Sequence, residues 1–260
     1  MTKTIYIMAT LEDGINLADV IRVMEFFKYL PYRVVTHKKL NIFFKQFNNK
    51  DIIDLKNFDI EKNKKNLINL ILYKEINDCY WDINKYSKGK FNKKKSYHIY
   101  KTLSIKNEYP YKLEKIKKNK KLKVGFNYLV PEQWKIKSYP DKKWYSLKEK
   151  IEKLDKTKFV VEYQPKLKII PYIKWIKSCD IIISVVGFGI HLASYFNKKI
   201  IMLSGPTDHY DYRKKNKIKK IYPARMCFVH KKKLYLKNKR CNCMKNISPE
   251  RIYTAFRKMI

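Results

Sequence analysis

The sequence has no uninterrupted apolar segment long enough to cross a bilayer. A membrane-spanning helix needs roughly 18 or more consecutive apolar residues, and none of the 260 residues begins such a run. Residues 1–10 form only a short apolar stretch, without the basic start, long apolar core and small-residue cleavage site of a signal peptide. We therefore expect a cytoplasmic protein.

Acidic residues and arginines are also scarce. The chain carries 23 acidic residues against 60 basic ones, a formal net charge of +37, and only seven of the basic residues are arginines. Arginine is the side chain that binds phosphates and base edges through two parallel hydrogen bonds, so its scarcity speaks against specific nucleic-acid recognition. Two interpretations of the lysines stay open. They form a solvated surface typical of AT-rich codon usage, or they attract polyanions such as nucleotide-sugars, anionic lipids or nucleic acid.

Several enzyme motifs are missing. The sequence contains no Walker A loop, no H-E-x-x-H zinc motif, no G-x-S-x-G elbow and no Asp-rich metal motif. It contains no D-x-D motif either, which disfavours a metal-dependent sugar transferase. No zinc-finger, RNP1 or KH signature of a nucleic-acid binder is present. We expect neither a metal ion nor a cofactor.

The five cysteines give no disulfide pattern, because their number is odd. Cys227, His230, Cys241 and Cys243 lie close in the sequence. Their spacing, C-x2-H-x10-C-x-C, matches no common zinc site, and one residue between two thiols is fewer than the usual two to four. We favour ordinary thiols and keep a structural zinc site as the alternative.

The apolar pattern of the first half predicts alternating strands and helices. Strands are expected over 3–10, 32–36 and 51–55, and helices over 19–30 and 40–47. This alternation favours a parallel sheet with crossover helices. The Lys- and Asn-rich stretch that follows, up to residue 121, has few periodic runs and contains the expected domain boundary near 112–121.

The second half repeats the pattern with clearer signals. The continuous apolar run over 180–186 is typical of a strand that is covered on both faces. The other expected elements are strands over 122–127, 159–163 and 199–204, helices over 144–154, 169–177 and 190–196, and a last helix that Ser248 caps and that reaches Ile260. The fold class is therefore α/β with parallel sheets.

Ligands of open α/β sheets bind where strands end and helices begin. The first such junction holds Asp19, which could act as a general base or serve as a helix N-cap. The second runs from Gly187 through Gly189 to His191. Its glycines permit close approach of a ligand, its helix start favours a phosphate, and its histidine could donate a hydrogen bond. The alternative is a tight turn with His191 packed in the interior.

The third junction is Ser204–Asp208, which offers a hydroxyl and backbone amides, or is an ordinary turn. Lys142 and Lys143 precede Trp144 and are further candidates. A lysine there could meet a phosphate as a point charge. The alternative is a solvated lysine among many.

In chain order these segments resemble the ADP-heptose:lipopolysaccharide heptosyltransferases, a family of GT-B glycosyltransferases. Leu17–Val20 resembles the family's L-G-D-V, Lys142–Trp144 its K-x-W, His191–Ala193 its H-L-A, and Ser204–Asp208 its F-G-P-T-D. Cys243–Glu250 resembles its C-M ending before the last helix. The likeness is good over 122–260 and thin over 1–55, and the three C-terminal motifs in this order make it fairly specific.

The resemblance implies a GT-B-like pair of Rossmann-like domains. A shortened domain over 1–115 would hold the acceptor, and a domain over 122–260 would bind the nucleotide-sugar. It implies metal-independent, inverting transfer of heptose or a related sugar, with Asp19 as the base and Lys142 as a phosphate ligand. The donor site would also include Gly187, Gly189, His191, Gly205, Pro206, Thr207 and Asp208.

The implied partners are an ADP-sugar, in preference to other nucleotide-sugars, and an anionic glycan or glycolipid acceptor such as lipopolysaccharide. Peripheral contact with the anionic inner membrane face is compatible with these partners, and no specific nucleic acid is expected.

The sequence also departs from the family pattern. Val186 stands where the family has an Asp, and the loop before Asp19 is longer, with Glu12 and Asp13 as rival carboxylates. The alternative function is therefore a non-catalytic GT-B relative or a basic protein that binds nucleic acid or an anionic surface.

Overall fold

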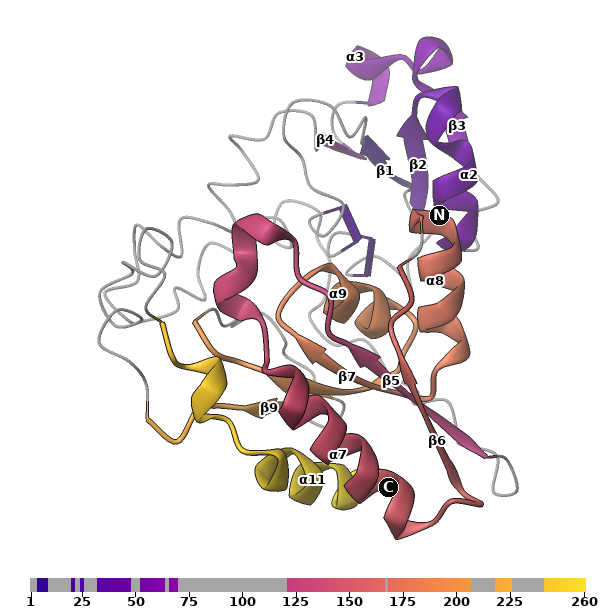
Figure 1. Ribbon diagram of the computed structural model, residues 1–260. Coiled ribbons are helices and arrows are strands. Elements are labelled where there is room, and N and C mark those ends of the chain that lie inside the picture. Colours follow the sequence, from indigo (N-terminus) through magenta and orange to yellow (C-terminus); the bar gives the residue numbers. More distant parts are fainter. Residues whose placement is uncertain are drawn as a thin grey trace. The chain divides into compact units, whose positions relative to one another are not determined.

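The computed structural model (Figure 1) describes residues 4–8, 20–21, 24–25, 32–47, 52–63, 66–69, 121–166, 168–206, 218–225 and 241–260. The chain divides into two compact units, Met1–Lys112 and Leu113–Ile260. Both units contain a parallel sheet, so the predicted α/β class is confirmed. In the described part of the chain, none of the helices combines the length and the apolar character that crossing a membrane requires.

The first unit contains a four-stranded parallel sheet in the order β3-β2-β1-β4. Its strands are β1 (Ile5–Met8), β2 (Tyr32–Thr36), β3 (Ile52–Asp54) and β4 (Leu67–Asn69). The first three confirm predicted strands. The sequence did not predict β4, because this strand of three residues lies in a Lys- and Asn-rich stretch and is defined by its pairing with β1.

The predicted helix over 40–47 is broken into three short pieces. A single α-turn, α2 (Asn41–Phe44), lies between the 3₁₀ turns η1 (Lys38–Leu40) and η2 (Lys45–Phe47). The apolar residues of this segment nevertheless face the core, because Phe43, Phe44 and Phe47 are buried. Two further short elements are η3 (Leu55–Asn57) and α3 (Ile60–Asn63).

The second unit contains a five-stranded parallel sheet in the order β6-β5-β7-β8-β9. Its strands are β5 (Leu122–Asn127), β6 (Phe159–Tyr163), β7 (Ile181–Val185), β8 (Lys199–Leu203) and β9 (Ile218–Ile221). The first four confirm predictions, and β7 is buried over its whole length, as expected for a central strand. The edge strand β9 was not predicted, since its Ile-Lys-Lys-Ile sequence has no continuous apolar run.

Helices cover both faces of this sheet. Alternate strand residues, such as Phe126 and Ile183, share one core with Trp144 and Phe256 of α7 (Asp141–Leu154) and α11 (Pro249–Arg257). The adjacent strand residues face the other way, toward α8 (Ile169–Ser178) and α9 (Phe188–Tyr195). Figure 1 shows α7 and α11 side by side. The 3₁₀ turns η5 (Glu132–Lys137) and η7 (Met244–Asn246) complete the unit.

The last helix begins as predicted and ends earlier. The Ser248 side chain accepts a hydrogen bond from the Arg251 amide at 3.4 Å, and Pro249 occupies the first turn. The helix ends at Arg257 rather than at Ile260.

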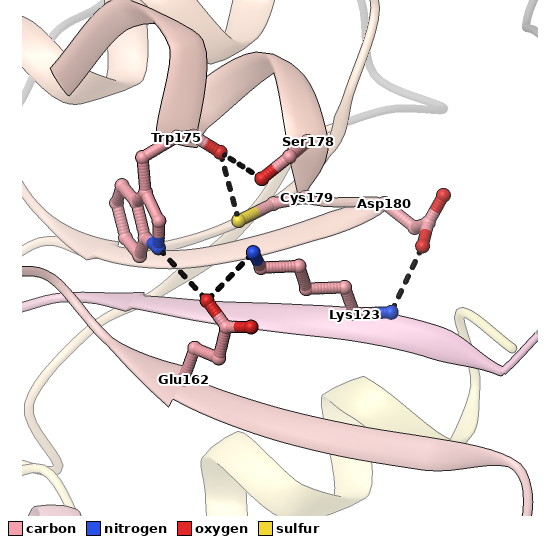
Figure 2. Close-up of polar contacts among 6 residues, drawn as sticks. All are labelled: Lys123, Glu162, Trp175, Ser178, Cys179 and Asp180. Carbon is pink, nitrogen blue, oxygen red and sulfur yellow. Dashed lines mark hydrogen bonds and ion pairs between the residues drawn. The ribbon is translucent and has the colours of Figure 1, made fainter. Parts of the chain in front are cut away.

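A polar cluster fixes α8 to the sheet (Figure 2). The Lys123 ammonium lies 2.6 Å from a Glu162 carboxylate oxygen, and the Trp175 indole donates to that carboxylate at 3.3 Å. The Lys123 amide donates to the carboxylate of Asp180 at 2.8 Å. Gly125 permits the close approach of α8, because a Cβ there would lie 2.7 Å from the buried Cys179 sulfur. The lysine and the two acids therefore have structural roles.

Candidate functional site

The candidate site lies at the carboxyl edge of the second sheet. The neighbouring strands β5, β7 and β8 end at Asn127, Val185 and Leu203. Since all three strands are parallel, their ends share one edge, which is where open α/β sheets bind ligands. The fold thus brings the segments that follow β7 and β8, which begin at Val186 and Ser204, to the same edge as the β5 end.

A buried polar network joins two of these strand ends. The Asn127 side-chain amide donates to the Ser184 hydroxyl at 2.7 Å, and the Ser184 hydroxyl donates to the Val185 carbonyl at 2.7 Å. The Tyr172 hydroxyl of α8 donates to the Asn127 side-chain oxygen at 2.7 Å. Burial raises the pKa of Tyr172 above its usual value, which keeps this donor protonated.

Sequence reasoning missed this network. The sequence contained a signal for it, because Asn127 is a polar residue at the end of one apolar strand and Ser184 is a polar residue inside another. Unpaired polar groups are costly to bury, so each implied a partner. The partners themselves lie 45 and 57 residues away and could not be assigned from the sequence.

The two glycines of the second junction differ in their surroundings. A Cβ at Gly189 would overlap the Asn127 amide and the Tyr172 hydroxyl, so this glycine lets α9 pack against the network. Gly187 is the N-cap of α9, and a Cβ there would meet no atom of the described residues within 4 Å. Of the two, Gly187 borders open space at the positive end of a helix, where backbone amides favour an anion.

His191 and Val186 are both buried. The His191 side chain is 3% exposed in the middle of α9, which favours its packing in the interior. Val186, at the position where the resembled family has an Asp, is 4% exposed. Val186 therefore supplies an apolar side chain at the position where the resemblance implies a carboxylate. The role of His191 in donor binding stays a prediction.

The third junction contacts two other segments, the end of β9 and the segment before the last helix. The Ser204 amide donates to the Ile221 carbonyl at 2.9 Å, and Ser204 is fully buried. A Cβ at Gly205 would overlap the thioether of Met244, so the glycine is needed for this close contact. Pro206 follows and is buried.

The two lysines before Trp144 have different environments. Lys142 is exposed in the first turn of α7. The Lys143 ammonium instead donates to the backbone carbonyls of Lys245 and, at 2.9 Å, Ile247. Trp144 is 1% exposed and packs on Phe126, with ring centroids 4.8 Å apart. Lys142 is therefore exposed to solvent, whereas Lys143 is engaged in contacts within the protein, and the role of Lys142 as a phosphate ligand stays a prediction.

Sequence reasoning also missed a half-buried lysine in the segment between β5 and α7. The Lys137 ammonium lies 4.1 Å from the centre of the Trp134 ring, a cation–π contact. Burial lowers the pKa of Lys137 to about 8.

Several predicted residues lie outside the described residues: Asp19, Glu12, Asp13, Thr207, Asp208, Cys227 and His230. Among the residues that are described, no three His, Cys, Asp or Glu side chains gather in a way that could hold a metal ion. Cys241 and Cys243 are described, and Cys243 is buried.

No family model matches the sequence, and no curated protein matches it. Solved structures do match. The E. coli heptosyltransferase WaaC with ADP-2-deoxy-2-fluoro heptose is 11% identical, with 99% of this chain and 100% of that chain covered and a TM-score of 0.56. A family 9 glycosyl transferase from Veillonella parvula is 13% identical, with 99% and 97% covered and a TM-score of 0.57.

A third similar structure is the dodecameric iron-containing heptosyltransferase TibC in complex with ADP-D-beta-D-heptose. It is 11% identical, with 99% of this chain and 77% of that chain covered and a TM-score of 0.56. At these identities the likeness establishes the fold. The chain has the α/β fold of the heptosyltransferases over nearly its whole length, which confirms the GT-B-like prediction.

Proposed function

We propose that this protein, which has the heptosyltransferase fold, is a metal-independent, inverting glycosyltransferase. It transfers heptose or a related sugar from a nucleotide-sugar to a cell-surface glycan or lipopolysaccharide. The observation that carries the proposal is the fold likeness, which covers 99% of the chain and nearly all of two heptosyltransferase-fold enzymes. The WaaC and TibC structures contain ADP-sugars, which favours an ADP-sugar donor here.

The carboxyl edge of the second sheet supports donor binding. Gly187 borders open space at the start of α9, so a diphosphate can approach the backbone amides there. Lys142 is exposed at the start of α7 and supplies a cation for the same diphosphate. Gly205, Pro206, Thr207 and Asp208 complete this donor site in the proposal, and His191 supports it from the interior of α9.

The proposed reaction is a single displacement. An acceptor hydroxyl attacks the anomeric carbon, its proton passes to the Asp19 carboxylate, and the bond between the anomeric carbon and the diphosphate oxygen breaks. The electron pair leaves with the nucleoside diphosphate. Lys142 and the amides at the α9 start stabilise the charge that develops on the leaving group, and binding both substrates in alignment lowers the barrier further.

We place the acceptor in the first unit and the donor in the second, and the protein in the cytoplasm. Its charge of +37 supports peripheral contact with an anionic membrane face, where the glycolipid acceptor would lie.

A second candidate is a non-catalytic relative that keeps the fold. The buried Val186 favours it, because an apolar side chain replaces a family carboxylate at the candidate site. Such a protein would bind a nucleotide-sugar or an anionic surface without turnover.

The experiment is a thermal-shift screen of ADP-, UDP- and GDP-sugars, followed by calorimetry and by an assay of ADP release with a glycolipid acceptor. We expect stabilisation by an ADP-sugar, and weaker binding by Lys142→Met. Lys153→Met is the matched control, since Lys153 is exposed at the other end of α7. Binding without ADP release would favour the second candidate. Salt-dependent DNA retention without nucleotide-sugar binding would contradict the proposal.

A further inference from the structure

Lys143 connects the start of α7 to a segment that lies just before the last helix. Its ammonium donates to the carbonyls of Lys245 and Ile247, the second at 2.9 Å. The Tyr139 hydroxyl donates to the same Ile247 carbonyl at 3.2 Å. These contacts join residues more than 100 positions apart in the chain. The start of α7 and this segment are therefore held together by side-chain donors.

One accepting carbonyl, that of Lys245, belongs to a short 3₁₀ turn, and the other, that of Ile247, belongs to its C-cap residue. η7 covers Met244–Asn246, and the last carbonyls of a helix have no partner within it. A cation is favoured at this end, and a lysine can satisfy such carbonyls directly. Lys143 therefore fixes the end of η7 as a charged cap supplied by another part of the fold.

The same segment, 243–247, contacts two other parts of the carboxyl edge; we call it the bracket. Met244 is 2% exposed and touches Gly205, which lies in residues 204–206 directly after β8; we call these three residues the Gly205 loop. Asn246 accepts from the Ala224 amide at 3.3 Å and donates to the Arg225 carbonyl at 3.2 Å, in the stretch after β9. The bracket thus lies between the start of α7 and the exits of two strands.

We propose that Lys143 is a positioning residue that, through the bracket, holds the Gly205 loop in the conformation that binds the nucleotide-sugar. The proposal rests on the proposed function, because it assigns the Gly205 loop to the donor site. The two neighbouring lysines then have different tasks. Lys142 meets the diphosphate, whereas Lys143 touches no substrate and acts through Met244.

The test compares the wild-type protein with Lys143→Met, Lys143→Arg and a matched control, Lys199→Met. Lys199 makes the same kind of contact, since its ammonium donates to the Met259 carbonyl. It begins β8, however, and so lies at the opposite edge of the sheet from Gly205. Amide hydrogen exchange of peptides covering 200–206 and 241–248 measures the loop and the bracket, and calorimetry with ADP measures donor-site affinity.

We expect Lys143→Met to speed exchange in both peptides and to weaken ADP binding about tenfold, since a hydrogen bond from a charged group is lost. Lys143→Arg should keep most of the slow exchange in both peptides and most of the ADP affinity, because it keeps the charge and the hydrogen-bond donors. Lys199→Met should lower the melting temperature and leave ADP affinity unchanged, which separates positioning from general stability.

Unchanged exchange at 200–206 in Lys143→Met would overturn the proposal. Faster exchange in Lys143→Met with unchanged ADP affinity would also overturn it. So would a loss of ADP affinity in Lys199→Met as large as that in Lys143→Met. If the wild-type protein binds no nucleotide, the proposed function fails, and the exchange data alone decide whether Lys143 holds the Gly205 loop.

Discussion

The Asn127 side chain donates a 2.7 Å hydrogen bond to the Ser184 hydroxyl and so joins the carboxyl ends of two neighbouring strands. Asn127 is 4% exposed and Ser184 is fully buried. In the folded protein their polar atoms form hydrogen bonds with one another and with Tyr172 instead of with water. α9 packs against this network through Gly189, so the network positions the helix whose start borders the proposed donor site.

Tyr172→Phe should destabilise the protein by about 1–3 kcal/mol, because the buried Asn127 oxygen loses its donor. Urea unfolding monitored by circular dichroism measures the change. Tyr145→Phe is the control, since Tyr145 is 61% exposed and its loss should change stability by less than about 0.5 kcal/mol. Equal stability of the two variants would show that the Tyr172 bond contributes nothing.

Alanine substitutions should separate the two glycines before His191. Gly189→Ala places a methyl against Asn127 and Tyr172 and should cost about 1–3 kcal/mol by overpacking. The methyl of Gly187→Ala meets no atom of the part of the chain that the structure describes, so the melting temperature should stay nearly unchanged, while the methyl occupies the space that the proposed diphosphate would enter. We expect Gly187→Ala to weaken ADP binding without a loss of stability. In Gly189→Ala, any loss of ADP affinity should accompany the loss of stability, because this glycine lets α9 pack on the network. Calorimetry measures ADP affinity at a temperature where both variants are folded. Full ADP affinity of Gly187→Ala would place the diphosphate elsewhere.

Lys137 should make stability depend on pH. Burial lowers its pKa from 10.5 to about 8, so between these values the unfolded chain binds more protons than the folded protein. The free energy of unfolding should therefore rise with pH across this window, relative to Lys137→Met. Urea unfolding at pH 7.5 and 9.5 tests this. Lys135→Met is the control. The Lys135 side chain is 75% exposed, so the pH dependence of this variant's stability should match that of the wild type.

Asp19→Asn should reduce turnover by roughly 10²–10⁴-fold if Asp19 is the base that accepts the acceptor proton. Asparagine keeps a side-chain oxygen and nearly the same shape, so stability should change little. ADP release measures turnover, and Asp13→Asn and Glu12→Gln are the comparisons. Full activity of Asp19→Asn together with loss in one of the other two would move the base to that residue.

The excess positive charge should make the protein bind anionic vesicles. Each lysine near such a surface contributes roughly 1 kcal/mol, and salt screens the attraction. Sedimentation with vesicles of phosphatidylcholine containing phosphatidylglycerol should retain the protein at low salt and release it at high salt. Equal binding to pure phosphatidylcholine vesicles would contradict an electrostatic contact.

Local sequence patterns were sufficient to predict those elements whose signal lies within a single stretch of the chain. The unbroken apolar run of β7 predicted a strand covered on both faces, and its five residues are all buried. Ser248 and Pro249 predicted the start of α11, because capping depends on neighbours within one turn. β4 and β9 were not predicted, since each is short and is defined by its pairing, β4 with β1 and β9 with β8.

Apolar periodicity was enough to predict that this protein alternates strands and helices around parallel sheets, and the strand–helix junctions that it predicted are the proposed ligand sites. The packing of distant segments was needed to see what the described residues at those junctions contact. It separated Gly187 from Gly189, and Lys142 from Lys143, which the sequence presents as near-equivalent pairs. The reason is physical: periodicity records which face of an element is apolar, whereas a hydrogen bond or a close contact depends on which distant segment packs against that face.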